Sequence, residues 1–246
     1  ILTLSFYSCG KTESKTPNDY GRLAYKYLEY IDNNLPDRDC INGANYKDSK
    51  NWIISELTDA GYTKDEIKVT NFTFVNEKNN KKVTSQNISV TKKGTSDKQI
   101  IIGAHYDGTG ASDNGSGTAL ALANATEFFG VDTYYNLTFV FFSAEEYGLW
   151  GSCEYADSMS KTEIKNTQYM INIDSILCGD YCYLYGGVAD FKKKTVKDTK
   201  AYENAKVLAK KLKLDVKANP WTFDNPEPTA EDNTPSYPGP STGDWS

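Results

Sequence analysis

The chain has 246 residues, 39% of them apolar, which is enough for the core of one large α/β domain. The formal net charge of −6 and the pI near 5.0 argue against a nucleic-acid groove, because such a groove needs clustered Lys and Arg. No stretch approaches the roughly 20 apolar residues of a membrane-spanning helix, so we predict no transmembrane span.

The N-terminal segment is typical of the end of a signal peptide. Residues 1–9 are apolar and end in Ser-Cys-Gly, and a polar run follows them. We therefore expect residues 1–18 to be a signal remnant and tether, and residues 19–246 to be the folded domain. Phe6-Tyr-Ser-Cys9 resembles a loose lipoprotein cleavage box, in which Cys9 would carry a lipid; a cleaved secretory signal with an incidental Cys is the alternative. Both interpretations predict export, to the extracellular space or the cell surface.

Four segments open the folded region. Apolar residues at helical spacing predict helices over Asp19–Asn34 and Tyr46–Ala60. Alternation of apolar and polar residues over Lys68–Val75 and Lys82–Thr91, with Asn79-Asn80 between them, predicts an antiparallel hairpin with one wet face. We expect both strands of this hairpin to lie at a sheet edge.

Short apolar runs, each followed by a helical segment, then replace the alternating pattern. The runs Gln99–Ala104, Leu137–Phe142 and Tyr169–Ile173 predict strands that are buried on both faces. The helices are expected over Gly117–Phe129, Gly148–Ser160 and Asp198–Leu214. We therefore predict an α/β fold, a three-layer α/β/α sandwich around a mixed, mostly parallel central sheet. Residues 219–246 hold six of the eight prolines and predict a long functional or disordered loop.

Acidic residues and the chain's only histidine follow these three buried strands. They are His105, Asp107 and Asp113 after the first strand, Glu145 and Glu146 after the second, and Asp174 after the third. Ligands of parallel α/β sheets bind beyond the carboxyl ends of the strands, so these side chains are expected to converge. Clustered carboxylates repel one another unless cations neutralise them. Imidazole and carboxylate ligands together suit zinc, with cobalt or manganese as substitutes.

Each of these residues also has a role that the two-metal hypothesis assigns to it. The glycine-rich stretch after the first strand lets Asp113 return beside His105 and bridge two ions. Glu145 and Glu146 are adjacent, so one can bind metal while the other acts as general base on a metal-bound water. Asp107 is placed to accept the other imidazole N–H. Taken singly, a Glu-Glu pair is usually solvated surface, and only the combined order favours a hydrolytic site.

The pattern resembles peptidase family 28, the co-catalytic zinc aminopeptidases that include the bacterial leucyl aminopeptidases. Four stretches carry the resemblance: Gly103-Ala-His-Tyr-Asp-Gly108, Ala111-Ser-Asp-Asn-Gly-Ser-Gly117, Phe142-Ser-Ala-Glu-Glu-Tyr-Gly-Leu-Trp-Gly-Ser152 and Asn172-Ile-Asp174. It covers most of residues 20–246. The resemblance implies two Zn²⁺ ions and hydrolysis of N-terminal residues from peptide substrates. We separately expect a monomer.

The resemblance also implies individual roles. By this likeness His105 and Glu146 would hold one zinc, Asp174 would serve the other and Asp113 would bridge. Glu145 would be the base, and Asp107 would support the imidazole of His105. Tyr183 or Tyr185 would assist the substrate oxyanion, and the sequence does not choose between them.

Two departures from the family pattern affect the second metal. The loop between His105 and Asp113 is shorter than in many relatives, and the second histidine, usually in a Ser-Asp-His motif, is absent. The chain stops at Gly243-Asp-Trp-Ser246, where that motif would begin. We therefore expect a C-terminally incomplete catalytic domain whose second metal binds weakly.

Two other functions compete with peptide hydrolysis. Glutaminyl cyclisation uses a similar fold with a single zinc, so metal stoichiometry separates it from the peptidase. A non-catalytic binding domain is opposed by retention of the ligand set. Among the cysteines, the close spacing of Cys178 and Cys182 predicts a disulfide, with thiolate zinc ligation as the alternative, and the pairing of Cys40 and Cys153 is left open.

Overall fold

The computed structural model describes residues 21–177, 182–186, 188–190, 192–197 and 199–218. Two compact units divide the chain; the described part of the larger unit is residues 21–177, and the other described residues belong to the smaller unit. None of the helices among the described residues is long and apolar enough to cross a membrane. Residues 1–20, with Cys9, and residues 219–246, with the proline-rich segment, lie outside the described residues.

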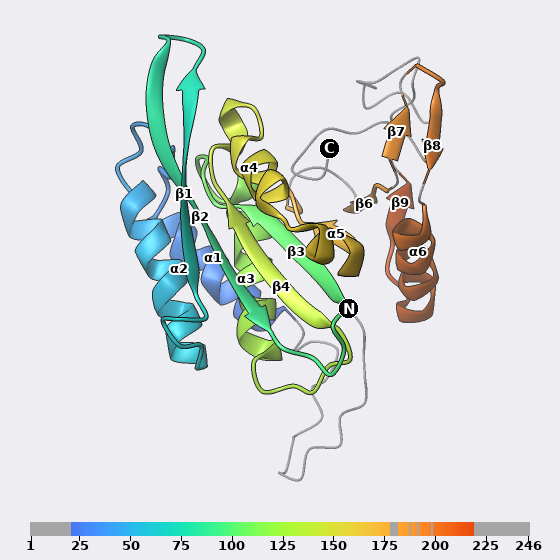
Figure 1. Ribbon diagram of the computed structural model, residues 1–246. Coiled ribbons are helices and arrows are strands. Elements are labelled where there is room, and N and C mark those ends of the chain that lie inside the picture. Colours follow the sequence, from blue (N-terminus) through green and yellow to red (C-terminus); the bar gives the residue numbers. More distant parts are fainter. Residues whose placement is uncertain (1–20, 178–181, 187, 191, 198, 219–246) are drawn as a thin grey trace. The chain divides into compact units, whose positions relative to one another are not determined.

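The larger unit is built on a five-stranded sheet with the order β1-β2-β4-β3-β5 (Figure 1). Its strands are β1 (Lys68–Asn76), β2 (Lys81–Lys92), β3 (Gln99–His105), β4 (Asn136–Phe142) and β5 (Thr167–Asn172). β3 pairs in parallel with β4 and β5, whereas β2 pairs antiparallel with β1 and with β4. Four strands therefore run in one direction and β2 in the other, which confirms the predicted mixed, mostly parallel sheet.

Two predictions about strand position were wrong. The hairpin forms, but only β1 is an edge strand, because the second half of β2, from Ile88 to Lys92, pairs with β4. β5 was expected to be buried on both faces, yet Ile171 is 45% exposed. In the described sheet β5 pairs with β3 alone. It is therefore an edge strand there, with fewer neighbouring residues around it than β3 and β4 have.

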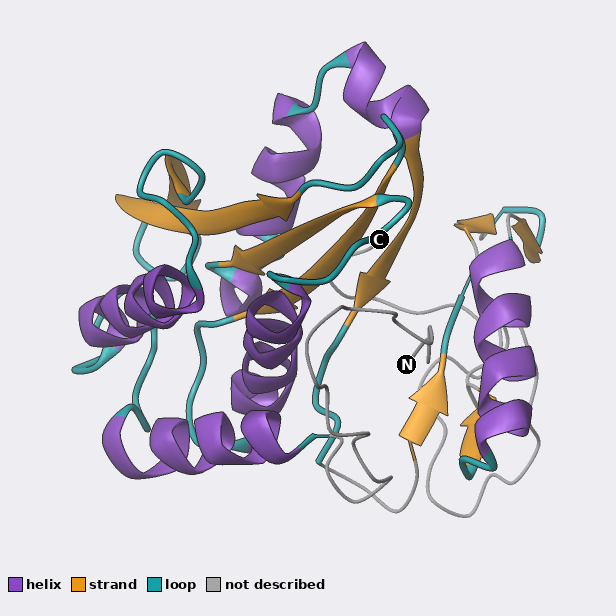
Figure 2. Ribbon diagram, turned by 90° about the horizontal axis from the view of Figure 1, so that it is seen from below, coloured by secondary structure: helices purple, strands orange, loops and turns teal. Residues whose placement is uncertain are grey.

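Helices cover both faces of this sheet, as Figure 2 shows. On one face α1 (Arg22–Asn34), α2 (Tyr46–Ala60) and α3 (Gly117–Phe128) share a core with side chains of β2, β3 and β4. On the other face Ile101, Val140 and Phe142 pack against Tyr155 of α4 (Trp150–Ser158) and Met159. Since successive strand residues point to opposite faces, both cores draw on the same strands. The predicted three-layer sandwich is confirmed.

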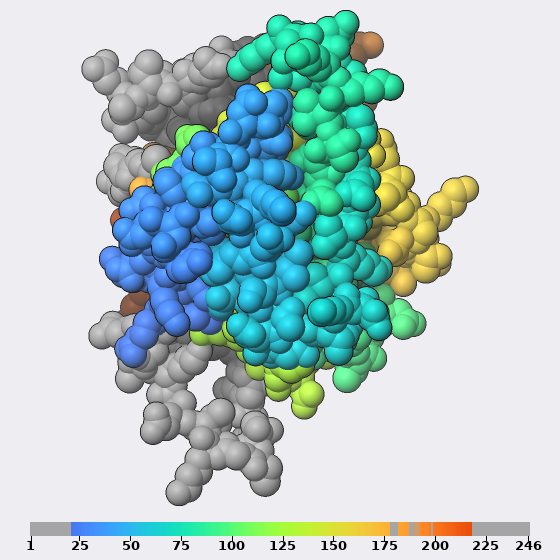
Figure 3. Space-filling model, turned by 90° about the vertical axis from the view of Figure 1, so that its left-hand side faces the viewer, coloured from blue at the N-terminus to red at the C-terminus, as the bar shows by residue number. Residues whose placement is uncertain are grey.

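The first two helices follow from their apolar spacing. Tyr27 and Ile31 are the buried residues of α1, and Ile53 and Leu57 are buried in α2, four residues apart in each helix. Gly61 ends α2 at a φ of 115°, a conformation that glycine adopts without strain. Figure 3 shows the face of the molecule on which α2 lies beside the β1–β2 hairpin. The helix predicted over residues 46–60 is confirmed.

The helix predicted over residues 148–160 begins later than expected. Glu145–Tyr147 forms a 3-10 turn, and Gly148 and Leu149 both have positive φ angles, so α4 starts only at Trp150. A separate helix, α5 (Lys161–Asn166), follows and is capped by the side chain of Ser160. The turn leaves Glu145 and Glu146 between the strand and the helix.

The smaller unit contains short elements. β6 (Cys182–Leu184) pairs in parallel with β9 (Val216–Ala218), and β7 (Val188–Asp190) pairs antiparallel with β8 (Thr195–Lys197). α6 (Lys200–Leu212) corresponds to the helix predicted over residues 198–214. The three-residue strands were not predicted, because they are too short for a periodic pattern.

Candidate metal centre

Adjacent strand ends bring the predicted site residues together. His105 is the last residue of β3 and pairs in parallel register with Phe142, the last residue of β4. The ends of these two strands, and the turn that carries Glu145, therefore lie at one edge of the sheet. Asp174 follows β5 by two residues at the same edge, because β5 is parallel to β3.

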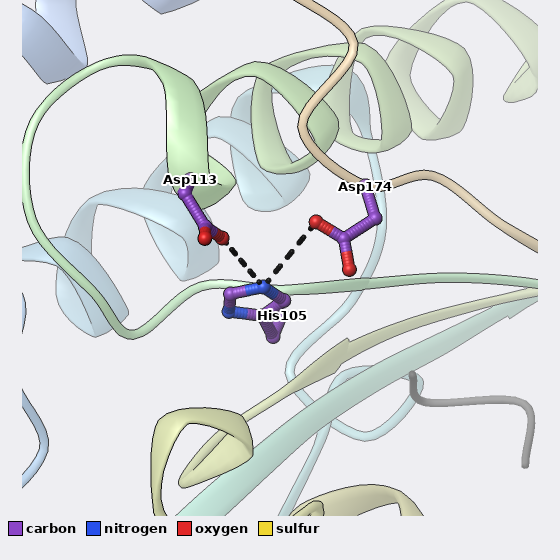
Figure 4. Close-up of side chains that lie close together, drawn as sticks. All are labelled: His105, Asp113 and Asp174. Carbon is purple, nitrogen blue, oxygen red and sulfur yellow. Dashed lines mark ion pairs between the residues drawn. The ribbon is translucent and has the colours of Figure 1, made fainter. Parts of the chain in front are cut away.

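Three carboxylates converge on one nitrogen of His105. The Nε2 atom lies 3.2 Å from Oδ1 of Asp113, 3.6 Å from Oδ1 of Asp174 and 3.9 Å from Oε2 of Glu145. Figure 4 shows Asp113 and Asp174 approaching the imidazole from two separate segments. The oxygens of these two aspartates and the imidazole nitrogen lie within 4.8 Å of one another, close enough to share a metal ion. A single N–H cannot satisfy three carboxylates, whereas a divalent cation can.

The pKa shifts and the net charge of these side chains also favour a bound cation. Burial by itself would lower the pKa of His105, but hydrogen bonds with Asp113 and Asp174 outweigh it and raise that pKa well above its ordinary value. The hydrogen bond from His105 lowers the pKa of Asp113. Burial, and then the charge of Asp113, raise the pKa of Glu146. The carboxylates hold more negative charge than one imidazolium balances, so the donor set fits a metal cation.

The carboxylate of Glu146 lies beside Gly108, in the loop after β3. A Cβ atom on Gly108 would lie 3.1 Å from Oε1 of Glu146, and the φ of Gly108 is 117°, so glycine is required there. Glu146 also lines a polar hollow of about 240 Å³ together with Asp39, Lys78, Thr109 and Tyr147. Among the described residues, the group around His105 contains Asp113 and Asp174 and not Glu146. The expected pairing of His105 with Glu146 therefore differs from the geometry, which groups His105 with Asp174.

Asp107 supports the site in a different way from the one predicted. The Nδ1 atom of His105 is 3.2 Å from the main-chain oxygen of Asp107 and 3.8 Å from its carboxylate. The same carboxylate accepts a hydrogen bond of 3.3 Å from the backbone N–H of Glu145. Asp107 is fully buried, and it links the end of β3 to the turn after β4.

Asn114 was missed by the sequence analysis. Its Nδ2 donates to the carbonyl of Ile173 at 2.8 Å, and its Oδ1 accepts from the N–H groups of Gly117 at 2.9 Å and Ser175 at 3.1 Å. Asn114 thus ties the segment of Asp113 to the residues on both sides of Asp174. Its place directly after a predicted ligand was the available signal, but its partners 59 and 61 residues along the chain cannot be read from the sequence.

The remaining predicted site residues come after β5 in the chain. Tyr183 is on β6 and Tyr185 follows it, and their role at the oxyanion stays a prediction. Cys182 has a free thiol, as do Cys40 and Cys153. Cys178 lies outside the described residues, so the structure gives the predicted disulfide no support and the pairing stays a prediction.

Sequence comparison connects this geometry to a known family. A sequence model of peptidase family M28 matches residues 87–234, which are more than half of the chain and include the carboxyl ends of β3, β4 and β5. The chain belongs to peptidase family M28. The predicted family is therefore confirmed.

Named proteins from several organisms are similar in sequence to this M28 chain. The aminopeptidase YwaD of Bacillus subtilis is 39% identical over 100 residues, which are 38% of this chain and 22% of that protein. The alkaline phosphatase isozyme conversion protein of Escherichia coli is 30% identical over 163 residues, 57% of this chain and 47% of that protein. The M28 chain thus spans less than half the length of these relatives.

Solved structures share the fold at lower sequence identity. BSAP, a zinc aminopeptidase from Bacillus subtilis, has a TM-score of 0.65 at 17% identity, over 80% of this chain and 79% of that one. A glutaminyl cyclase from an Acidobacteriales bacterium has a TM-score of 0.64 at 18% identity, over 94% of this chain and 91% of that one. These likenesses establish the zinc-exopeptidase fold of the M28 chain.

Proposed function

We propose that this protein is a two-zinc aminopeptidase that removes N-terminal residues from peptides, with Glu145 as the general base. The observation that carries the proposal is the convergence of the Asp113, Asp174 and Glu145 carboxylates on the Nε2 atom of His105. Membership of family M28 and the identity to aminopeptidase YwaD support the peptidase class.

The geometry suggests how the ligands divide between the ions. His105, Asp113 and Asp174 would hold one zinc, because their donor atoms already lie within 4.8 Å of one another. Glu146, which lies outside this group, would hold the second zinc, with Asp113 shared between the two. When bound, zinc polarises the scissile carbonyl and lowers the pKa of water. The chain contains no second histidine, so the second ion would bind more weakly than the first.

Glu145 is suited to moving protons in this reaction. Its side chain is 19% exposed and 3.9 Å from Nε2 of His105, farther than either aspartate, which leaves it next to the metal ligands. The hydrogen bond between its backbone N–H and Asp107 holds the turn that carries it. Glu145 would take a proton from the attacking water and pass it to the leaving amine.

The proposal is tested with a panel of aminoacyl-p-nitroanilides, before and after chelation and with zinc added back. We expect cleavage that disappears with chelation, returns with zinc, and falls by roughly 10²- to 10⁴-fold in a Glu145→Gln variant, the usual range for loss of a general base. Glu127→Gln, on α3, is the matched control for the loss of one carboxylate and should leave the rate unchanged. Absence of cleavage by protein with two bound zinc ions would refute the peptidase proposal.

A glutaminyl cyclase is the second candidate, because a protein of that class shares the fold over 94% of this chain. A peptide with N-terminal glutamine separates the two activities in a mass spectrometer: a cyclase releases ammonia and keeps the peptide length, whereas an aminopeptidase releases glutamine. Metal analysis adds a second criterion, since one tightly bound zinc favours the cyclase.

Export and a monomeric state complete the proposal. The apolar segment before Cys9 supports export, with Cys9 as the possible point of lipid attachment. Cell fractionation with a Cys9→Ala variant tests it, because a lipoprotein would leave the membrane fraction when Cys9 is replaced. Sedimentation of the purified protein tests the monomer.

A further inference from the structure

Arg38 is a buried cation to which the sequence analysis assigned no role. It is one of two arginines in the chain, lies four residues beyond the end of α1, and is 1% exposed. Removing a guanidinium from water is unfavourable unless hydrogen bonds and opposite charges compensate for the lost hydration. The contacts of Arg38 should therefore show what it does.

Its side chain holds the segment that joins His105 to Asp113. Nε donates to the carbonyl of Tyr106 at 3.0 Å, and Nη1 donates to the carbonyl of Gly110 at 3.0 Å. These two carbonyls lie at the two ends of the loop that leaves β3, so one planar group spans the loop. Nη1 also donates to the carbonyl of Leu35 at 2.8 Å, which fixes the guanidinium to its own segment.

The main chain around Arg38 repeats this connection. The N–H of Arg38 donates to the carbonyl of Gly108 at 2.9 Å, and the N–H of Gly110 donates to the carbonyl of Pro36 at 2.7 Å. Asp37 and Thr109 form an antiparallel bridge between the two contacts. Backbone hydrogen bonds therefore join the segment after α1 to the loop after β3.

The loop needs such support from outside. Gly108 and Gly110 both have positive φ angles, and glycine-rich backbone loses more conformational entropy on ordering than any other. On its far side the Nη2 atom of Arg38 would lie 3.5 Å from a Cβ atom on Gly115, just before α3. Arg38 thus reaches the chain both before and after Asp113. Its charge also faces the carboxylates of Asp107 and Asp113.

A side chain that only filled space in the core would not need the hydrogen-bond donors of a guanidinium. An apolar side chain of similar volume could occupy the same space, but it could not donate to the carbonyls of Tyr106 and Gly110, which lie 68 and 72 residues beyond Arg38 in the chain. A lysine would keep the charge and lose the planar arrangement of donors.

We propose that Arg38 is a positioning residue of the metal centre, which fixes the loop between His105 and Asp113 and so maintains the affinity of the centre for its metal. The proposal rests on the metal site of the proposed function. It adds a residue from outside the part of the chain that the family model matches.

The test is cobalt and zinc binding by the whole chain. Wild type, Arg38→Lys and Arg38→Met are titrated with Co²⁺, followed by its visible absorption, and with Zn²⁺ by calorimetry. Arg22→Lys and Arg22→Met are matched controls at the exposed start of α1. We expect Arg38→Met to weaken metal binding by about 10- to 100-fold, as is usual for residues that orient ligands, with a changed cobalt spectrum. Arg38→Lys should lie between Arg38→Met and wild type, and both Arg22 variants should match wild type.

Thermal unfolding in excess chelator separates a local role from a general one. We expect the metal-free Arg38→Lys variant to remain folded. Wild-type affinity and spectrum in both Arg38 variants would overturn the proposal. So would unfolding of both variants in chelator, because Arg38 would then support the whole fold. If wild type itself binds no cobalt or zinc, the proposed metal centre fails, and that result is distinct from a failure of Arg38 alone.

Discussion

Replacing Asn114 by alanine should destabilise the larger unit strongly. Asn114 is fully buried, and loss of its side chain leaves the Ile173 carbonyl without that partner in a region closed to water, whereas the Gly117 N–H keeps its hydrogen bond to the main-chain oxygen of residue 114. A buried group left unsatisfied costs about 1–3 kcal/mol, and we expect a loss of that size. The Ser175 N–H is only partly buried, and water can replace that hydrogen bond. Since domains are stable by only about 5–15 kcal/mol, this is a large loss.

Urea unfolding in excess chelator measures the loss without a contribution from bound metal. The four tryptophans provide the fluorescence signal. With a denaturant slope of about 2 kcal/mol per molar, the midpoint of Asn114→Ala should fall by about 0.5–1.5 M. Asn33→Ala is the control: its Nδ2 donates to Glu29 on an exposed helix face, and its loss should cost less than about 0.5 kcal/mol. A cost below about 1 kcal/mol for Asn114→Ala would refute the argument.

Three further predictions concern packing, capping and pH. Gly103→Ala in β3 should cost about 1–3 kcal/mol in urea unfolding, because the new methyl group would meet the ring of Phe142 at 2.5 Å; a neutral result would show that the ring can move. Ser160→Ala should cost about 1 kcal/mol through loss of the α5 cap, and unchanged stability would show that the cap contributes nothing. Burial alone would raise the pKa of Asp39, but hydrogen bonds from Tyr147 and two backbone amides lower it. The stabilisation is therefore present above the ordinary aspartate pKa of about 4 and is lost as pH falls through the lowered pKa. Asp39→Asn should melt below wild type at neutral pH and converge with it in acid, and a constant difference would contradict this.

The sequence predicted the elements that depend on near neighbours. Apolar residues four apart in α1 and α2 bury one helix face, and continuous apolar runs marked β3 and β4 as central strands. These patterns act over a few residues, so they can be read without knowing the fold. For the same reason the start of α4 was misplaced, because the positive φ angles of Gly148 and Leu149 interrupt a pattern that looks helical.

The sequence predicted which residues form the candidate site but not how they group around a metal ion. His105 and Asp174 each follow an apolar strand, and parallel strands bring their carboxyl ends to one edge. Which ligands share an ion depends on side-chain directions after each strand, and the sequence does not record them. The grouping of His105 with Asp174 in place of Glu146 therefore required coordinates.

By itself, the sequence determined the family, the layered α/β fold and the identity of the residues gathered at the strand ends, because each follows from local pattern or motif. Tertiary structure alone decided that β2 lies inside the sheet, that Asn114 clamps the segment of Asp174, and that Arg38 holds the loop between His105 and Asp113. The physical reason is the long separation in sequence between the interacting residues. Asn114 and Arg38 act through hydrogen bonds to backbone groups 59 to 72 residues away, and any residue can supply a backbone carbonyl or N–H. No sequence pattern therefore marks the partner.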